Sequence, residues 1–179
     1  MTQNSSAIPR LCVRYGFRHY QTLQLLSCPM RLALYQPDIA QNTATLIRLC
    51  ACLGVPMDVI EPCGFVFSDR NFRRAGMDYL DQAAVTRHTS WTAFVRDRAP
   101  GRLVLLTTKA GDRYTDFSFM DDDTVLLGRE SAGVPDEVHA TADARLRIPL
   151  RDGLRSLNVA LAGAMVLGEA LRQTNGFPA

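Results

Sequence analysis

The sequence lacks any apolar run long enough to cross a membrane. Its longest such run extends from Val159 to Gly168 between Asn158 and Glu169, whereas a membrane helix needs roughly 18 to 20 apolar residues. With 47% hydrophobic and 21% charged residues over 179 positions, the composition is that of one soluble globular domain. We therefore expect no membrane segment.

Cysteine is sparse and is not arranged for chemistry. The five cysteines include no Cys-x-x-Cys pair, and the three histidines form no ligand-like cluster with them. This spacing argues against both a disulfide framework and a zinc centre. We interpret the cysteines as buried thiols of a protein in a reducing cytoplasm, and we expect no metal. The residues concerned are Cys12, Cys28, Cys50, Cys52, Cys63, His19, His88 and His139.

The usual nucleotide-binding fingerprints are also missing. No Gly-x-Gly-x-x-Gly follows the first predicted strand, and Gly128 to Gly133 is followed by Val134 and Pro135, where a phosphate-binding loop needs Lys and then Ser or Thr. NAD-dependent enzymes and ATPases with this loop are therefore disfavoured.

An excess of one charge is absent as well. The chain has 20 Lys and Arg against 18 Asp and Glu, and Lys109 is its single lysine. Arg10, Arg14 and Arg18 stand in the first 29 residues without any acidic residue, so the remainder is nearly neutral. Any RNA site must therefore rest on a local patch.

We interpret residues 1–29 as an N-terminal extension, either a transit peptide or a stretch read from an upstream start codon, before one domain over residues 30–179.

What the sequence does contain is an alternation of strand and helix patterns. Such an alternation predicts an α/β fold, with a mostly parallel sheet covered by helices on both faces. We expect strands at 31–35, 57–60, 83–85, 103–107, 124–127 and 144–148, and helices at 42–53, 90–98, after Pro135 and at 157–172.

Three segments, Pro37 to Gly54, Leu127 to Pro135 and Arg147 to Leu171, each place a loop between a strand and a helix. In parallel sheets, ligands bind outside the carboxyl ends of the strands, where such loops gather. Free main-chain groups beside helix starts can hold a polar small molecule there. The sequence therefore predicts a cofactor pocket at one edge of the sheet.

The residues of these segments resemble, in order, the three motifs of SPOUT methyltransferases. The motifs are Pro37–Thr43 (PDIAQNT) with Ile47–Cys50 (IRLC), then Leu127–Pro135 (LGRESAGVP), then Ile148–Pro149 (IP) with Ser156–Asn158 (SLN). Connecting segments are most similar to members that methylate the wobble nucleotide of tRNA: Ile60–Pro62, Gly64–Phe65, Arg73–Tyr79, Val85–His88 and Leu106–Lys109. The resemblance extends from Met30 to Gln173.

The resemblance implies a deep trefoil knot at the C-terminal end, a homodimer and S-adenosylmethionine bound in the knotted loops. It also implies a tRNA substrate and a cytoplasmic location. By motif position, the expected cofactor-binding residues are Leu106, Gly128, Ile148 and Ser156, with Glu130, Pro149 and Leu157 beside them. Gly128 and Gly133 have a plainer alternative, which is that they only permit turns.

The resemblance places Arg48, Asn42 and Ser156 in the catalytic site. A ribose 2'-hydroxyl is a poor nucleophile, so it must be aligned with the methyl donor and its developing charge must be offset. A guanidinium stays protonated, which makes Arg48 a group for orientation and charge stabilisation rather than a base. The structural alternatives are a solvated helix face for Arg48 and helix N-caps for Asn42 and Ser156.

For RNA binding we expect a basic cluster to contact phosphates. Its members are Arg70, Arg73, Arg74, Arg87 and His88. Phe65 and Phe67 could stack on an unpaired anticodon base. The alternatives are an ordinary solvated face for the cluster and a core position for the two aromatic rings.

Two positions depart from the family pattern, because Ala44 and Arg129 replace a usual glycine and a frequent proline.

The small-residue helix from Val159 onward must be buried on more than one side, either in the core or across a twofold axis.

The leading interpretation is an enzyme that methylates the 2'-oxygen of the wobble cytidine or uridine. The alternatives are methylation of another ribose in tRNA or rRNA, and a non-catalytic RNA-binding dimer. A non-catalytic dimer would be expected to lack Arg48 or the Ser156–Asn158 turn, and both are present.

Overall fold

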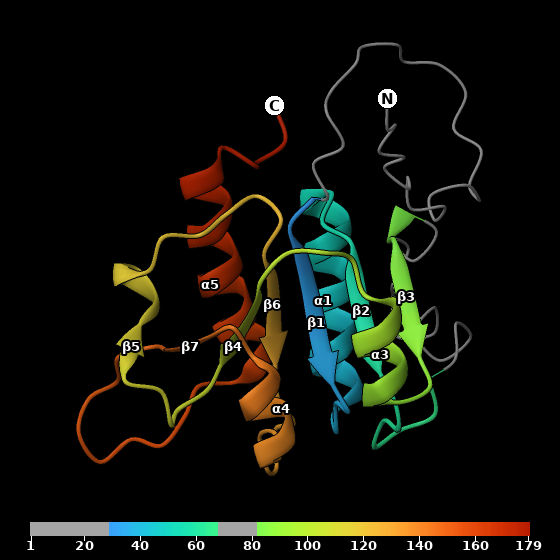
Figure 1. Cartoon of the computed structure of the whole chain (residues 1–179), viewed down its shortest axis with the longest axis horizontal. Coiled ribbons are helices and arrows are strands. Elements are labelled where there is room, and N and C mark those ends of the chain that lie inside the picture. The colour runs from blue at the N-terminus through green and yellow to red at the C-terminus, as the bar shows by residue number, and fades with distance from the viewer. Residues whose placement is uncertain (1–28, 68–81) are drawn as a thin grey trace, which may run out of the picture.

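The computed structural model describes residues 29–67 and 82–179. It contains one seven-stranded sheet in the order β3-β2-β1-β6-β4-β7-β5, and every pair of neighbours is parallel (Figure 1). The predicted α/β fold with a parallel sheet is therefore confirmed. The strands are β1 (Arg31–Tyr35), β2 (Met57–Ile60), β3 (Val85–His88), β4 (Leu103–Leu106), β5 (Asp112–Arg113), β6 (Thr124–Leu127) and β7 (Ala144–Arg147).

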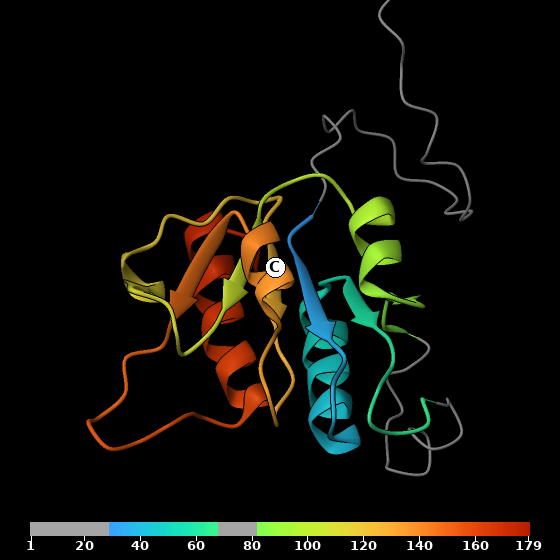
Figure 2. The ribbon, with the colours of Figure 1, turned by 60° about the horizontal axis from the view of Figure 1, so that its bottom comes forward.

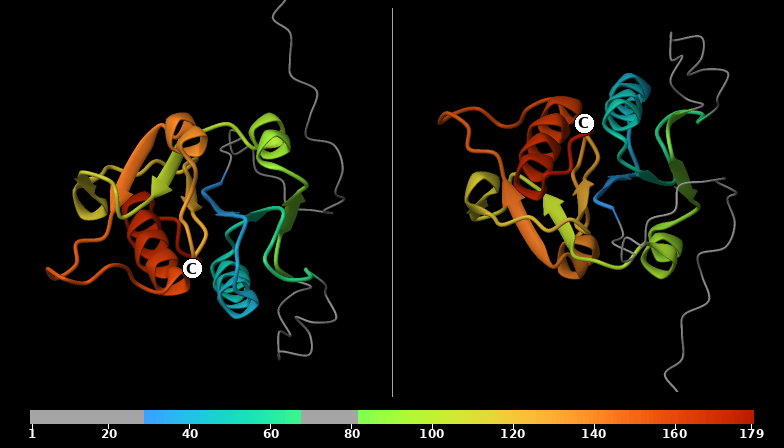
Figure 3. Two further views of the ribbon diagram at one scale, coloured as in Figure 1. Left: turned by 90° about the horizontal axis from the view of Figure 1, so that it is seen from below. Right: turned by 90° about the horizontal axis from the view of Figure 1, so that it is seen from above.

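Helices cover both faces of this sheet. Seen end-on in Figure 3, α1 and α5 lie on one face and α3 and α4 lie on the other. The helices are α1 (Ala40–Leu53), α3 (Trp91–Asp97), α4 (Asp136–Thr141) and α5 (Val159–Thr174), with a single-turn 3-10 helix η2 (Tyr114–Asp116). None of the helices in the described ranges is long and apolar enough to span a bilayer.

Each strand divides its side chains between two apolar clusters. Along β1, Leu32 and Leu34 face the cluster under α1 and α5, while Ala33 and Tyr35 face the cluster that includes Phe94 of α3. This alternation follows from the two-residue repeat of a strand. Because both faces are buried, the strands read in the sequence as nearly continuous apolar runs.

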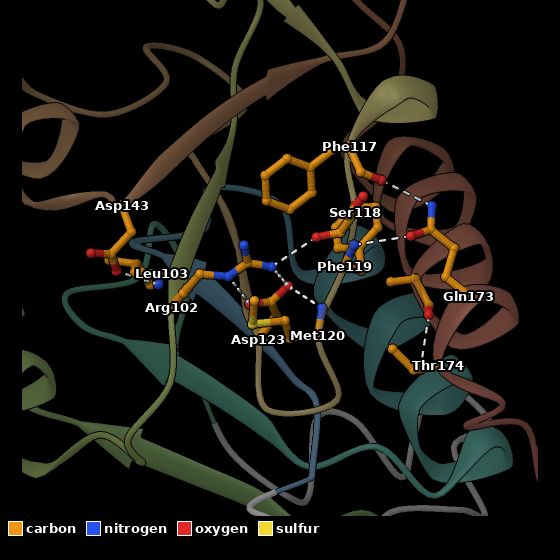
Figure 4. A network of polar contacts seen from close by, with 11 residues as sticks. Arg102, Leu103, Phe117, Ser118, Phe119, Met120, Asp123, Asp143, Gln173 and Thr174 are labelled. Carbon is orange, nitrogen blue, oxygen red and sulfur yellow. Dashed lines mark hydrogen bonds and ion pairs between the residues drawn. The ribbon is translucent and has the colours of Figure 1, made fainter.

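The end of the sheet where β6 begins is held by an ion pair whose carboxylate is buried. The Arg102 guanidinium donates from Nε and Nη2 to the two carboxylate oxygens of Asp123, each at 2.8 Å, and Asp123 is fully buried (Figure 4). Gln173 of α5 joins the same loop by accepting from the Phe119 amide at 2.9 Å and donating to the Phe117 carbonyl at 3.0 Å. These contacts join α5 to the segment before β6, at the end of the sheet opposite the loops at the carboxyl ends.

Several predicted boundaries are corrected. The first helix begins at Ala40, two residues before Asn42, and no side chain caps it. The last helix begins at Val159, because the Asn158 carboxamide accepts from the Ala160 and Leu161 amides at 2.9 and 3.3 Å. The alternatives that made Asn42 and Ser156 the caps are therefore wrong. The exposed two-residue strand β5 was not predicted, because it contributes no apolar side chain.

Candidate cofactor pocket and active site

A cavity of about 470 Å³ opens at the carboxyl ends of β4, β6 and β7. Its lining residues come mainly from the loops that follow these strands and from the start of α5. The ribbon of these segments can be followed in Figure 2. Cavities of a few hundred Å³ are typical of small-molecule sites. Of the predicted cofactor residues, Pro149 does not line the cavity, and Asn42 lines it as well. The predicted cofactor residues that line it are Leu106, Gly128, Glu130, Ile148, Ser156 and Leu157.

Glu130 connects the loop after β6 to the start of α1. One carboxylate oxygen accepts from the Asp38 main-chain amide at 2.8 Å, and the other accepts from the Asn42 carboxamide at 3.1 Å. The Asn42 oxygen in turn accepts from the Asn158 carboxamide at 2.9 Å. Because Asn158 also caps α5, one chain of hydrogen bonds joins all three motif segments. Both polar atoms of Asn42 are thus engaged within the chain.

Asp38, which the sequence did not indicate as a site residue, is a second connection between the segment after β1 and the loop after β6. Its carboxylate accepts from the Ser131 amide and hydroxyl at 3.1 and 2.5 Å and pairs with the Arg129 guanidinium at 3.0 Å. The hydrogen bond from the Ser131 hydroxyl, with further help from Arg129, lowers the pKa of Asp38 below its ordinary value. Arg129, which replaces a frequent proline, therefore fixes the cavity loop to the segment after β1.

Gly128 is required by a close approach of backbone. The loop doubles back so that the amides of Arg129 and Gly133 each donate to the other residue's carbonyl, at 3.0 and 2.9 Å. A Cβ atom on Gly128 would lie 2.8 Å from the Gly133 carbonyl carbon. Gly133 itself has a φ of 68°, in the left-handed region. The alternative that a glycine permits the turn is correct for Gly133, whereas Gly128 is needed for the close approach of the backbone. Both glycines also stand in the cavity wall.

Arg48 lies outside this cavity wall. It is exposed on α1 and is not among the residues that line the cavity. It follows Asn42 by six residues, which at 100° per residue places the two side chains on different sides of the helix. Within one chain, Asn42 therefore faces the cavity and Arg48 faces the surface.

The predicted RNA-binding residues do not form one exposed cluster. Arg87 is exposed on β3, but it pairs with Glu61 and lies 4.8 Å from the centre of the Phe67 ring. His88 is only 5% exposed, and its Nε2 lies 2.9 Å from the Asp58 carboxylate. We therefore remove His88 from the RNA-binding set, because burial withholds its ring from a ligand. Arg70, Arg73 and Arg74 lie outside the described residues, as does almost all of the predicted extension.

Comparison with known proteins identifies the family of the chain. The model of the SpoU rRNA methylase family matches residues 29–168. A protein of Beijerinckia indica named tRNA (cytidine(34)-2'-O)-methyltransferase is 67% identical over 148 residues, which cover 82% of this chain and 92% of the relative.

Solved structures agree with this match. A structure from work on "the 2-OH methylation of C/U34 on tRNA" has a TM-score of 0.77 at 36% identity, covering 82% of this chain and 97% of the other. An AdoMet-bound rRNA methyltransferase of Sinorhizobium meliloti has a TM-score of 0.72 at 26% identity, covering 80% and 56%. The chain belongs to the SpoU rRNA methylase family.

Proposed function

We propose that this protein transfers a methyl group from S-adenosylmethionine to the 2'-oxygen of nucleotide 34, a cytidine or uridine, in the anticodon loop of tRNA. The observation that carries the proposal is that the motif residues of three distant segments line one cavity at the carboxyl ends of the strands. The 67% identity to a tRNA (cytidine(34)-2'-O)-methyltransferase supports the choice of nucleotide.

The cavity suits the cofactor in size and chemistry. Its wall combines apolar side chains such as Leu106 and Ile148 with main-chain groups of turns, and the Gly128 backbone approaches without a side chain in the way. Glu130 adds a carboxylate to the wall, which suits a cationic sulfonium. These residues, with Ser156 and Leu157, would hold S-adenosylmethionine, which supplies an electrophilic methyl group.

The chain's own residues must then place the ribose. Asn42, fixed by Glu130 and Asn158, holds the start of α1 against the cavity mouth. Ser156 lines the same mouth with an exposed side chain. Arg48 acts from outside the cavity, where its guanidinium orients the ribose hydroxyl or the neighbouring phosphate and offsets the charge that develops on oxygen.

A homodimer accounts for the position of Arg48, since the partner's Arg48 can reach a cavity that the chain's own Arg48 does not line. Exposed apolar side chains on and before α5 support such an interface. Leu157, Leu161 and Met165 recur every four residues and are 39%, 61% and 42% exposed. Leu161 and Met165 lie on the same side of α5, and Leu157 lies in the loop just before it. Without a partner these apolar side chains would be exposed to water. We further propose that the cavity loops form a trefoil knot, and that the protein works in the cytoplasm.

Methylation of a ribose elsewhere in tRNA or in rRNA is the second candidate. The family description, which names rRNA, favours it. The two candidates differ in which nucleotide loses its methyl group when the gene is removed.

Nucleoside mass spectrometry of position-mapped RNA from cells with and without the gene tests the proposal. We expect the 2'-O-methyl group of nucleotide 34 to disappear in the deletion strain and to return with the wild-type gene. Arg48→Ala should fail to restore it, because the guanidinium is lost, while calorimetry should find nearly unchanged cofactor affinity because Arg48 does not line the cavity.

The matched control is Arg96→Ala, which removes another exposed arginine, one that pairs with its neighbour Asp97 on α3. This control should restore methylation fully. Unchanged methylation of nucleotide 34 in the deletion strain would refute the assignment, and a methyl group lost from another ribose would establish the second candidate.

A further inference from the structure

Two cations line the cavity, and three more stand in β5, in β7 and in the loop that follows β7. We call this set the cationic rim. Lys109 and Arg155 line the cavity itself, and Arg151 is an exposed residue of the loop that leads from β7 to Arg155. The rim consists of Lys109, Arg113, Arg147, Arg151 and Arg155.

The backbone holds the parts of the rim together. Arg113 of β5 and Arg147 of β7 are register partners on adjacent parallel strands, so their side chains leave the sheet on the same face. The Arg147 guanidinium donates from Nε to the Gly111 carbonyl at 3.3 Å, which ties it to the turn after Lys109. The loop from β7 to α5 projects on the same side of the molecule as β5 (Figure 1).

No carboxylate neutralises a rim cation within the described residues, in contrast to six of the arginines elsewhere. Among residues 29–67 and 82–179, no rim side chain forms an ion pair with a carboxylate, although Asp112, Asp116 and Asp152 stand in the same segments. Outside the rim, six arginines pair with carboxylates: Arg31, Arg87, Arg96, Arg102, Arg129 and Arg172.

Unpaired like charges side by side destabilise a sheet, and Arg113 beside Arg147 is such a pair. Local conflicts of this kind are typical of positions that serve a ligand. An anion with many negative charges would relieve the repulsion along the whole rim. A nucleic-acid backbone has this property, and the proposed reaction must bring a ribose between two phosphates to the same cavity mouth.

We propose that the cationic rim is the main phosphate-binding surface of this protein and that it holds the RNA backbone next to the nucleotide being methylated. This inference rests on the proposed function for the identity of the RNA. It differs from the expectation that binding centres on the segment around Arg87, whose charge is neutralised by Glu61.

The two surfaces can be tested separately. Arg87 is on β3 and Arg113 is on β5, at opposite edges of the seven-stranded sheet. Six strand spacings separate these edges, which corresponds to roughly 29 Å. Substitutions in the rim therefore leave the Arg87 region intact.

The test uses the full-length protein with Arg113→Gln and Arg151→Gln combined. Neither residue lines the cavity, so calorimetry should give wild-type affinity for S-adenosylmethionine. Affinity for an unmodified tRNA transcript, measured by fluorescence anisotropy over a series of salt concentrations, should fall by at least about tenfold. The slope of log affinity against log salt should become shallower by roughly one to two, because each lost phosphate contact removes slightly less than one unit.

The matched control combines Arg96→Gln and Arg172→Gln, which changes the net charge equally at exposed arginines that are paired within their own helices. It should retain wild-type affinity and slope. Equal losses in both double variants would show that only net charge matters, and no loss in the rim variant would remove the rim from RNA binding. Either result overturns the inference.

Methyl transfer in the same preparations separates this inference from the proposed function. The rim variant should show a raised KM for tRNA with a nearly unchanged kcat, because its substitutions lie away from the reacting atoms. If the wild type binds tRNA through the rim but methylates no nucleotide 34, the proposed function fails and the inference stands. If it methylates nucleotide 34 while the rim variant binds normally, the inference fails alone.

Discussion

At the scale of single residues, the cavity depends on polar side chains that bond to one another. Glu130 holds Asn42 and the Asp38 amide, and Asn42 holds Asn158. An intramolecular hydrogen bond contributes about 0.5 to 1.5 kcal/mol to stability. Substitution of one of these residues therefore also weakens the hold on the residue to which it bonds. Asn42 therefore supports the site's geometry in addition to any contact with RNA.

Gly128→Ala tests the close approach inside the cavity loop. Its Cβ would meet the Gly133 backbone at 2.8 Å, and the loop can yield only by opening the paired hydrogen bonds between Arg129 and Gly133. We expect the Kd for S-adenosylmethionine to rise at least about tenfold, which is about 1.4 kcal/mol. Calorimetry measures this directly.

The matched control for that substitution is Gly168→Ala, because a Cβ there meets nothing within 4 Å and the residue is inside α5. It should stabilise the fold by about 0.5 to 1 kcal/mol and leave cofactor affinity unchanged. Equal cofactor affinity in the Gly128 variant and the wild type would contradict the proposed role of the loop.

The sequence pointed to several residues that line the cavity, but not to the contacts that hold them. The motif positions Leu106, Gly128, Glu130, Ile148 and Ser156 were named from the sequence, and the structure brings them to one cavity. The burial of His88 could not be foreseen, because its partner Asp58 stands on a neighbouring strand 30 residues earlier. Only the register of β2 with β3 reveals that contact.

At the scale of elements, the buried strands and long helices were predictable and their ends were less so. The mostly apolar runs of β1, β2 and β6 can be recognised in the sequence. Gly54, with a φ of 67°, ends α1 at the position that the sequence predicts. The start of α5 was misplaced because Ser156 and Asn158 are both good N-caps. Only the three-dimensional path of the loop decides between them.

Asn158→Ala tests whether this cap also serves the cavity. The variant loses hydrogen bonds to two α5 amides and the bond to Asn42. We expect about 1 kcal/mol less stability in urea unfolding, together with weaker S-adenosylmethionine binding in calorimetry.

Ser90→Ala provides the comparison, because Ser90 accepts from the Ala93 amide at 3.1 Å as the cap of α3, and it does not line the cavity. It should lose similar stability and keep cofactor affinity. If the Asn158 variant behaves in the same way as Ser90→Ala, the hydrogen-bond chain does not control the pocket.

At the scale of the whole molecule, the sheet order sets the two ends of the protein apart. The Arg102–Asp123 pair and Gln173 secure the amino ends of the strands, while the loops at the carboxyl ends form the cavity. The same order separates the neutralised Arg87 from the rim at the other edge. A parallel sheet was predictable from the alternation of strands and helices. The strand order was not, because β1 pairs with β6, and β4 with β6 and β7, and the two strands of each of these pairs do not follow one another in the sequence.

The central claim is that the cavity mouth presents one ribose, that of nucleotide 34, to the methyl donor. The most direct measurement supplies methyl-labelled S-adenosylmethionine to the purified protein with two tRNAs that differ only by a ribose or a 2'-deoxyribose at nucleotide 34. We expect label at nucleotide 34 of the first tRNA and none in the second. Equal labelling of the two tRNAs, or no labelling of either, would contradict it.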